Sequence, residues 1–385
     1  MTLQDLAQAM IHQRASDLFI SSGNSVFIRV DGQLQRLHTE PLNDEVVREM
    51  AHSVLLEDEK HTLASRLAVD TSVGLEGLGR FRMNIFHQNG QVSMALRRVA
   101  SGDLSFEDLN LPVDVLTKLS SERRGLVLVT GTAGSGKSTT LAAMVSYMNR
   151  RLSRHIITIE DPVEYSFESD KSLIEQREVG LDTPDFPQAL RDVVRQSPDV
   201  IMIGEMRDKE TVDAAISACE TGHLVLSTLH TTNASQTVER IVNFFPPHLQ
   251  KQTRAQLAAV TRGILSLRLL KRRTGAGLIP AVEIMLGSPL IRKKIADGAI
   301  EEMAEVTAKS GAMGMQTFNQ ALIDLYKRGL IASEEGARTS DSMHEFNMLA
   351  VGVFATEASE IDKHGDTVAA AAKDKEDQGT IPFLE

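Results

Sequence analysis

The apolar pattern at the N-terminal end of the chain predicts a helix followed by a small antiparallel sheet. One face of the helix would carry the side chains of Leu3, Leu6, Ala7, Met10 and Ile11. Two short apolar runs follow at residues 18–20 and 26–30, and Asp31-Gly32 is a strong turn pair ahead of Leu34. The period of the pattern therefore changes from helical to extended early in the chain.

A second and clearer hairpin surrounds Asn89-Gly90. Apolar and polar residues alternate on both sides of this turn, with apolar side chains at Phe81, Met83, Ile85, Val92, Met94 and Leu96. A two-residue turn fixes the register, so that Gln88 pairs with Gln91 and Arg82 pairs with Arg97. Two opposed arginines repel each other. Either they contact an anion such as a phosphate, or they point into solvent or pair with local acids, and the spacing leaves both interpretations open.

From Gly125 onward, strand-like and helix-like patterns alternate, which favours an α/β fold with a mostly parallel sheet covered by helices. The candidate strands are residues 126–130, 155–160, 200–204 and 224–229. A short helix starting near Pro112 is expected in the connecting segment before them, and another amphipathic helix is expected around residues 318–326. Past about residue 350 the side chains are mostly small or charged, and we expect a disordered tail.

The composition is that of a globular chain long enough for two domains, with 385 residues of which 42% are hydrophobic. A net charge of −11 argues against nucleic acid as the main substrate, because phosphate backbones are bound by clustered Lys and Arg. Much of this charge is local: residues 333–385 contain twelve acidic and four basic residues, a net charge of −8. The remainder of the chain is nearly balanced.

The single cysteine, Cys219, excludes an intrachain disulfide and a zinc site of several cysteines. It follows Val212, Ala215 and Ile216 at helical spacing, which predicts core packing and not a nucleophile. The N-terminus lacks a basic region followed by an apolar one, and no apolar run approaches about 18 residues. We therefore expect a cytoplasmic protein that does not insert into a membrane itself.

The strongest chemical signal is the phosphate-loop pattern G-x-x-x-x-G-K-[ST] at residues 131–138. An apolar strand precedes it and a helix-forming segment follows it, as a nucleotide-binding loop requires; the alternative is a glycine-rich turn that binds nothing. Backbone N–H groups of such a loop bind phosphate oxygens, while Lys137 reaches the β- and γ-phosphates and Ser138 binds Mg²⁺. The expected nucleotide-binding residues are Gly131, Thr132, Ala133, Gly134, Ser135, Gly136, Lys137, Ser138 and Thr139.

Hydrolysis also needs acids near the phosphates, and two apolar strands end in them. Residues 200–204 lead into Glu205, which we expect to hold Mg²⁺. Residues 156–159 lead into Glu160, Asp161 and Glu164; we assign Glu164 to activating water, with Glu160 supporting the metal. Parallel strands place their carboxyl ends at one edge of a sheet, so these acids should converge on the loop. The alternative is that they only cap strand ends.

A histidine stands at each end of residues 224–229. Two histidines around one strand of this unit could sense the γ-phosphate, and we favour His230 over His223 for that role. A structural role is the usual alternative for a histidine. Arg195 and Arg207 are either structural or act on the nucleotide of a neighbouring subunit, and spacing does not decide between these roles.

Together these segments resemble the secretion-type ATPase superfamily, and within it the type IV pilus retraction motors of the PilT and PilU types. The likeness rests on the phosphate loop, on the acidic segment 160–164, on Gly204-Glu205-Met-Arg207-Asp208 and on the segment 222–230. It extends over nearly the whole chain, from Ala15-Ser-Asp-Leu-Phe19 and Arg80-Phe-Arg82 through Gln176-Arg-Glu178 to Gly314-Met-Gln-Thr-Phe318.

The resemblance implies a PAS-like N-terminal domain at residues 1–99, a linker at 100–124, a RecA-like ATPase domain at 125–349 and an acidic tail at 350–385. It also implies a homohexameric ring that uses ATP and Mg²⁺, with Glu164 as the catalytic glutamate and with Arg82 and Arg97 facing the nucleotide. The implied partners are an inner-membrane pilus platform protein and a second retraction ATPase, which would place the chain at the inner-membrane face of the pilus machine.

One segment departs from the retraction motors, which carry an Ala-Ile-Arg-Asn-Leu-Ile-Arg signature. Here the corresponding residues 290–296 read Leu-Ile-Arg-Lys-Lys-Ile-Ala, so that only Ile291, Arg292 and Ile295 match. This departure and the acidic tail make the resemblance lean toward the PilU type, the accessory motor.

The preferred function is an Mg²⁺-dependent ATPase that drives pilus retraction. A pilus-assembly or type II secretion ATPase typically has four zinc-binding cysteines, and this chain has one cysteine. A ring subunit that binds nucleotide with little turnover is the alternative from another class. A DNA motor would need a basic groove, which the acidic composition disfavours.

Overall fold

The computed structural model describes residues 1–37, 40–275 and 277–350, which form two compact units. The first unit consists of Met1–Leu104 and Val145–Gly204, and the second begins with Ser105–Met144 and resumes at Glu205. The chain thus enters each unit twice. The domain boundaries expected near residues 99 and 124 stay a prediction.

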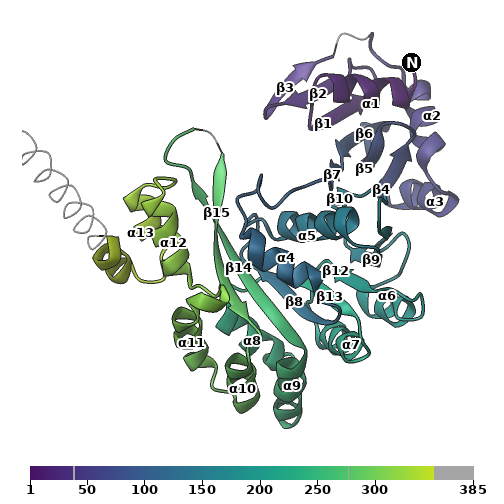
Figure 1. Ribbon diagram of the computed structural model, residues 1–385. Coiled ribbons are helices and arrows are strands. Elements are labelled where there is room, and N and C mark those ends of the chain that lie inside the picture. Colours follow the sequence, from purple (N-terminus) through teal and green to yellow (C-terminus); the bar gives the residue numbers. More distant parts are fainter. Residues whose placement is uncertain (38–39, 276, 351–385) are drawn as a thin grey trace, which may run out of the picture. The chain divides into compact units, whose positions relative to one another are not determined.

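The first unit opens with a six-stranded antiparallel sheet in the order β3-β2-β1-β6-β5-β4 (Figure 1). Its elements are α1 (Leu3–His12), β1 (Asp17–Ser21), β2 (Phe27–Val30), β3 (Gln33–Arg36), α2 (Asp44–Val54), α3 (Glu57–Arg66), β4 (Ala68–Leu75), β5 (Gly79–Gln88) and β6 (Gln91–Arg98). Helix α1 begins with a capping box between Thr2 and Asp5 and buries the apolar face that the spacing predicts. The initial helix and the two hairpins are therefore confirmed.

The hairpin of β5 and β6 has the predicted register, with Gln88 opposite Gln91 and Arg82 opposite Arg97. Asn89 has φ 51° and Gly90 has φ 76°, the left-handed conformations that a two-residue turn of this type needs. The alternate residues Phe81, Met83 and Ile85 are buried, which leaves Arg82 on the opposite face of the sheet.

The same unit also holds three parallel strands in the order β11-β9-β12. Its remaining elements are β7 (Ala100–Ser101), β9 (His155–Glu160), β10 (Tyr165–Ser166), β11 (Leu173–Glu178), α6 (Phe186–Val193) and β12 (Val200–Ile203). Strands β9 and β12 confirm two predicted strands. Every residue of β12 is buried, as expected of a parallel strand covered on both faces.

The second unit contains four strands in the order β13-β8-β14-β15. Strand β8 pairs in parallel with β13 and β14, whereas β14 and β15 form a long antiparallel hairpin that is prominent in Figure 1. The elements are α4 (Val113–Ser121), β8 (Gly125–Thr130), α7 (Lys209–Glu220), β13 (Leu224–Leu229), α8 (Ala234–Asn243), α9 (Pro247–Val260), β14 (Thr261–Lys271), β15 (Leu278–Leu286), α10 (Pro289–Asp297), α11 (Met303–Lys309), α12 (Phe318–Lys327) and α13 (Ser333–Thr339). Helix α5 (Lys137–Arg151) starts in this unit and ends in the first.

These elements confirm the predicted α/β class, the strands at β8 and β13, and the helices at α4 and α12. Helix α12 packs with the β14–β15 hairpin around the fully buried Phe318, over whose ring the guanidinium carbon of Arg268 lies at 3.7 Å. The predicted disordered tail lies outside the described residues from 351 onward. Among the helices of the described part of the chain, none is long and apolar enough to cross a membrane.

Candidate functional site

The phosphate loop joins β8 to α5 and is shaped by glycines in left-handed conformations. Gly131, Gly134 and Gly136 have φ values of 146°, 74° and 96°. A Cβ atom on Gly131 would lie 2.4 Å from Ser135 Oγ and 2.7 Å from the Leu267 carbonyl oxygen, so only glycine fits there. The Ser135 hydroxyl is buried and has no hydrogen-bond partner within the described residues. The loop is therefore tightly folded, and the hydroxyl of Ser135 could donate a hydrogen bond to a ligand or accept one from it.

Lys137 is the first residue of α5, and its side chain folds back over the loop. Its ammonium group donates to the Gly131 carbonyl at 2.9 Å and to the Thr132 carbonyl at 2.8 Å, and it lies 3.4 Å from Nδ1 of His230. The side chain is buried, with 8% of the residue exposed. An ammonium has three protons, and these contacts offer it three acceptors.

His230 connects Lys137 to Glu205. Its Nε2 lies 3.2 Å from one carboxylate oxygen of Glu205, while Nε of Arg207 donates to the other oxygen at 2.8 Å. In the tautomer that accepts from the ammonium at Nδ1, the ring donates from Nε2 to the carboxylate. Four side chains that were chosen separately from the sequence thus form one hydrogen-bonded series within the second unit.

His223 has a different position. Its Nδ1 lies 2.9 Å from the carbonyl oxygen of Ala218, near the C-terminal end of α7. This contact closes the last turn of that helix, which fits the structural role, and a response of His223 to the γ-phosphate stays a prediction.

A buried network that sequence reasoning missed supports the same loop. The Thr130 hydroxyl donates to Ser266 Oγ at 3.1 Å, Ser266 is hydrogen-bonded to the carboxylate of Glu283, and Glu283 accepts from the backbone N–H of Ala234 at 2.7 Å. Burial raises the pKa of Glu283 above its ordinary value, and its hydrogen bonds partly oppose this shift. The network ties the residue before Gly131 to the segment that follows His230.

The signal for Glu283 was present in the sequence. It is a carboxylate within the apolar run Ala281-Val-Glu-Ile-Met285, where a charged residue has to find partners inside the fold.

The acidic segment belongs to the first unit and follows β9. Glu160 is buried, and its carboxylate accepts from the Thr158 hydroxyl at 2.8 Å, the Gln176 amide at 3.1 Å and the backbone N–H of Glu164 at 3.2 Å. Burial raises its pKa, an effect that these hydrogen bonds partly offset. Its expected support of the metal stays a prediction, while the described contacts give it a second task, which is to hold the backbone at Glu164.

Glu164 itself is exposed, so that its carboxylate is free to meet a solvent molecule or a ligand. The carbonyl of the residue before it is fixed from another element: Arg82 donates from Nε and from an Nη atom to the Val163 carbonyl at 3.1 and 2.7 Å. Glu178, at the end of β11, adds a third constraint, because its buried carboxylate accepts from the Val163 N–H at 3.3 Å and from Arg80 at 3.0 Å. The backbone on which Glu164 stands is therefore held from three sides.

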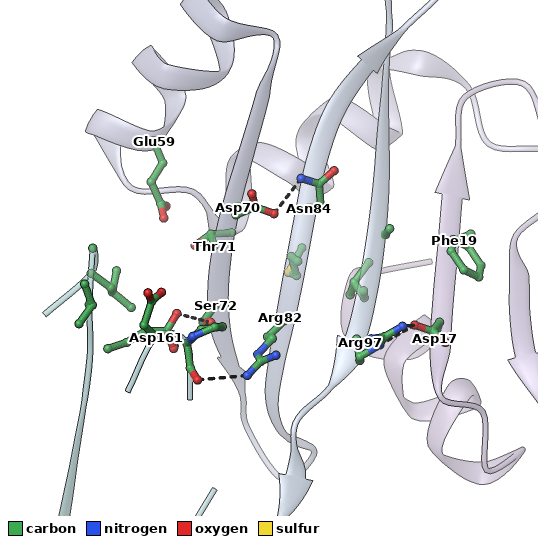
Figure 2. Close-up of a pocket in the computed structure, with 18 of the residues that line it drawn as sticks. Asp17, Phe19, Glu59, Asp70, Thr71, Ser72, Arg82, Asn84, Arg97 and Asp161 are labelled. Carbon is green, nitrogen blue, oxygen red and sulfur yellow. Dashed lines mark hydrogen bonds and ion pairs between the residues drawn. The ribbon is translucent and has the colours of Figure 1, made fainter. Parts of the chain in front are cut away.

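Figure 2 shows how the two opposed arginines avoid each other. Arg82 points toward the acidic segment, whereas Arg97 forms an ion pair with the buried carboxylate of Asp17 at 2.8 Å. Both line a cavity of about 650 Å³ that also receives Asp161 and Ser72. Local partners thus relieve the repulsion, which is one of the two interpretations that the sequence left open. A contact of either arginine with nucleotide stays a prediction.

The structure brings Lys137, His230 and Glu205 together, while Glu160 and Glu164 stand in the other unit. The approach of these last two acids to the phosphate loop stays a prediction. No group of three or more His, Cys, Asp and Glu side chains that could hold a metal ion occurs among the described residues. For Mg²⁺ the donors available beside the loop are the Ser138 hydroxyl and the partly buried carboxylate of Glu205, both oxygen ligands of the kind this ion takes.

Cys219 confirms the interpretation made from its spacing. It is buried on α7, and burial raises the pKa of its thiol to about 12, so the thiolate needed for reactivity does not form near neutral pH.

Comparison with known proteins gives a consistent result. The chain is 39% identical over 349 residues to the type IV pilus ATPase PilU of Pseudomonas aeruginosa, covering 91% of each chain. It is 41% identical over 345 residues to the type IV pilus retraction ATPase PilT of the same organism, covering 90% of this chain and 99% of that one. The solved structure of the pilus retraction motor PilT with bound ADP matches with a TM-score of 0.81 at 42% identity, over 90% of this chain and 98% of that one.

The family model described as Type II/IV secretion system protein matches residues 1–329. This match covers the phosphate loop, the acidic segment 160–164, Glu205 and His230. The chain therefore belongs to the family of type II/IV secretion system proteins.

Proposed function

We propose that this protein is an Mg²⁺-dependent ATP hydrolase that drives retraction of type IV pili and thereby twitching motility. Two relatives named as pilus ATPases support this proposal, since each is about two-fifths identical over nine-tenths of the chain. The bound ADP named for the PilT structure supports nucleotide use. The observation that carries the proposal is the series Lys137–His230–Glu205. It joins the phosphate-binding lysine to the expected metal-binding carboxylate. His230 contacts both residues, so a ligand that moves either of them also changes a contact of His230.

The residues have separate tasks in this proposal. Lys137 and the N–H groups of the loop bind the phosphates, while Ser138 and Glu205 hold Mg²⁺, which would neutralise the charge that develops on the phosphates. Glu164 orients and deprotonates the attacking water. A phosphate oxygen that binds Lys137 competes with two carbonyls and with His230 for three ammonium protons, so His230 responds to the presence of the phosphate.

The assembly follows from the same family relation. We place the protein in a homohexameric ring in the cytoplasm, at the inner-membrane face of the pilus machine, where an inner-membrane platform protein would receive its movement. A second retraction ATPase would act beside it if the chain is an accessory motor. Identities of 39% and 41% to PilU and PilT do not separate the two types. The leaning toward the accessory type rests on segment 290–296 and stays a prediction.

The test is a deletion strain scored for pilus number and twitching, alone and together with deletion of any second motor gene. Loss of retraction leaves surplus surface pili with reduced twitching, and a wild-type gene restores both while a Lys137→Ala gene does not. If pili are absent from the deletion strain, the protein is an assembly motor and the retraction proposal fails.

A further inference from the structure

A basic pocket lies in the second unit, away from the phosphate loop. It has a volume of about 450 Å³ and is lined by Lys118, Ser121, Glu122, Arg123, Arg124 and Arg262. Four of these six side chains are cations and one is an acid. Cations that line one pocket repel one another unless an anion lies between them. Such a cluster is unexpected in a protein of net charge −11.

The pocket and the phosphate loop are at opposite ends of one strand. Arg124 directly precedes β8 and the loop directly follows it, and a strand of six residues separates the two ends by about 20 Å. No residue that lines the pocket takes part in the proposed nucleotide chemistry.

Arg262 is built into the pocket wall. A Cβ atom on Gly125 would lie 2.7 Å from Cγ of Arg262 and 2.8 Å from its Nε, so the arginine crosses the start of β8 at a point where only glycine leaves room. One Nη atom lies 3.4 Å from the Ala259 and Val260 carbonyl oxygens, and Nε is 3.6 Å from Glu122. The side chain is thus held in place before any ligand arrives, which lowers the entropy cost of binding one.

Arg292 on α10 does not line the pocket, but its positive charge interacts with Arg262 and Glu122, which do. Its Nε is buried and has no hydrogen-bond partner among the described residues. Burial lowers the pKa of Arg292, the positive charge of Arg262 lowers it further, and only Glu122 opposes the trend. An anion in the pocket would relieve this repulsion.

The side chains of Arg123 and Arg124 are available to contact a ligand. Arg123 and Arg124 are exposed, and neither makes a hydrogen bond or an ion pair with another residue in the part of the chain that the structure describes. With one acid against four cations, the pocket lining favours a compact ligand that carries two or more negative charges. Guanidinium groups match phosphate oxygens with paired hydrogen bonds. The small volume of the pocket, about 450 Å³, also suits a compact anion.

We propose that the pocket formed by Lys118, Arg123, Arg124 and Arg262 binds a phosphoryl group, from either a free phosphate or the headgroup of an anionic lipid. This site is separate from the nucleotide site and does not depend on the proposed motor function.

The test uses the full-length protein saturated with ADP, so that the phosphate loop is already filled. Inorganic phosphate is titrated calorimetrically, and flotation is measured with phosphatidylcholine vesicles with and without phosphatidic acid. We expect saturable binding in at least one arm, weakened about tenfold in Arg123→Gln/Arg124→Gln, since each loses charge-assisted hydrogen bonds. Arg262→Lys keeps the charge, removes the planar fork and should weaken binding as well.

The matched control is Lys251→Gln/Arg273→Gln, which removes the same charge from exposed positions outside the pocket. Binding of inorganic phosphate alone identifies a free phosphate as the ligand, and binding only to vesicles with phosphatidic acid identifies a lipid headgroup. Absence of binding in both arms, or equal losses in the pocket and control variants, overturns the proposal. Unchanged melting temperatures show that all the variants are folded.

Discussion

At the scale of single residues, burial and hydrogen bonding give the same residue type different tasks. Glu164 is an exposed glutamate, whereas Glu160 and Glu283 are buried. The carboxylates of the two buried residues accept hydrogen bonds, and burial raises their pKa values. The exposed carboxylate is available to water, as a general base must be. The buried ones position the segments that carry Glu164 and His230.

The pKa of Glu283 leads to a prediction about stability. Because the folded-state pKa is raised, the folded protein ionises this group less readily than the unfolded chain does. The pKa of Glu283 in the unfolded chain is ~4.3, and its pKa in the folded protein is higher. Between these two pKa values, the free energy of unfolding of the wild type should fall with rising pH relative to that of Glu283→Gln. Above the folded-state pKa the difference between the two proteins should be constant.

Thermal unfolding of wild type and Glu283→Gln across this pH range measures the difference. The control is Glu334→Gln, which removes the same charge from an exposed position on α13. Equal pH slopes for the two variants would contradict the assignment of Glu283 as a buried carboxylate that resists ionisation.

The two opposed arginines allow a sharper comparison. Arg82→Gln removes the donor to the Val163 carbonyl and should let the backbone at Glu164 move, lowering kcat by about ten- to a hundredfold with little change in ADP affinity. Arg97→Gln removes the same charge from the same face but breaks a contact with Asp17 instead. It should leave kcat near the wild-type value.

Steady-state ATP hydrolysis and ADP titration distinguish the two roles. If both substitutions weaken nucleotide binding and leave kcat unchanged, the arginines act as direct ligands of the nucleotide and the positioning role of Arg82 is wrong.

At the scale of secondary-structure elements, strong local signals were sufficient. Asn89-Gly90 between two alternating runs gave the hairpin and its register, and buried apolar runs gave β8, β9, β12 and β13. Helix α3 was missed because its signal is weak: Leu63 is its one buried residue. Helix α2 was missed although its sequence carries a helical pattern. The Asn43 cap with the buried residues Val47, Met50 and Ala51 was the available sign of α2.

The β14–β15 hairpin was missed for another reason. The run Ile264-Leu-Ser-Leu-Arg-Leu-Leu270 is apolar enough to suit a buried helix or a strand, and its period does not decide between them. Pairing with β8 on one side and β15 on the other makes it a strand.

The hairpin turn gives a prediction at this scale. Gly90 has φ 76°, and a Cβ atom added there would have no other atom within 4 Å, so Gly90→Ala introduces backbone strain without a clash. The cost should be about 1–2 kcal/mol. Gly74→Ala is the control, since Gly74 also has open space in the neighbouring sheet strand but its φ is not positive. Urea unfolding of both variants measures this, and equal losses of stability would contradict a specific role for the left-handed turn.

At the scale of the whole molecule, the proposed motor function assigns nucleotide binding and chemistry to different residues. Lys137→Ala should weaken nucleotide binding at least about tenfold, because the loop loses its charged donor. Glu164→Ala should leave binding nearly unchanged and reduce turnover about a hundredfold or more, because it removes the base.

Equilibrium titration with ADP and steady-state hydrolysis of ATP measure the two effects separately. An equal loss of affinity in both variants would mean that the residues do not divide binding from chemistry. Hydrolysis rates equal to wild type in both would remove the motor proposal altogether.

The sequence alone determined the features that depend on neighbours along the chain: the glycine-rich loop before a helix, the turn at Asn89-Gly90, and strands that end in acids. These features are local because backbone conformation and short-range hydrogen bonds produce them. Only the tertiary structure decided which side chains meet across distant segments. Lys137 reaches His230 across 93 positions, and Thr130 reaches Ser266 across 136, since strand pairing brings their elements together and no spacing in the sequence records it.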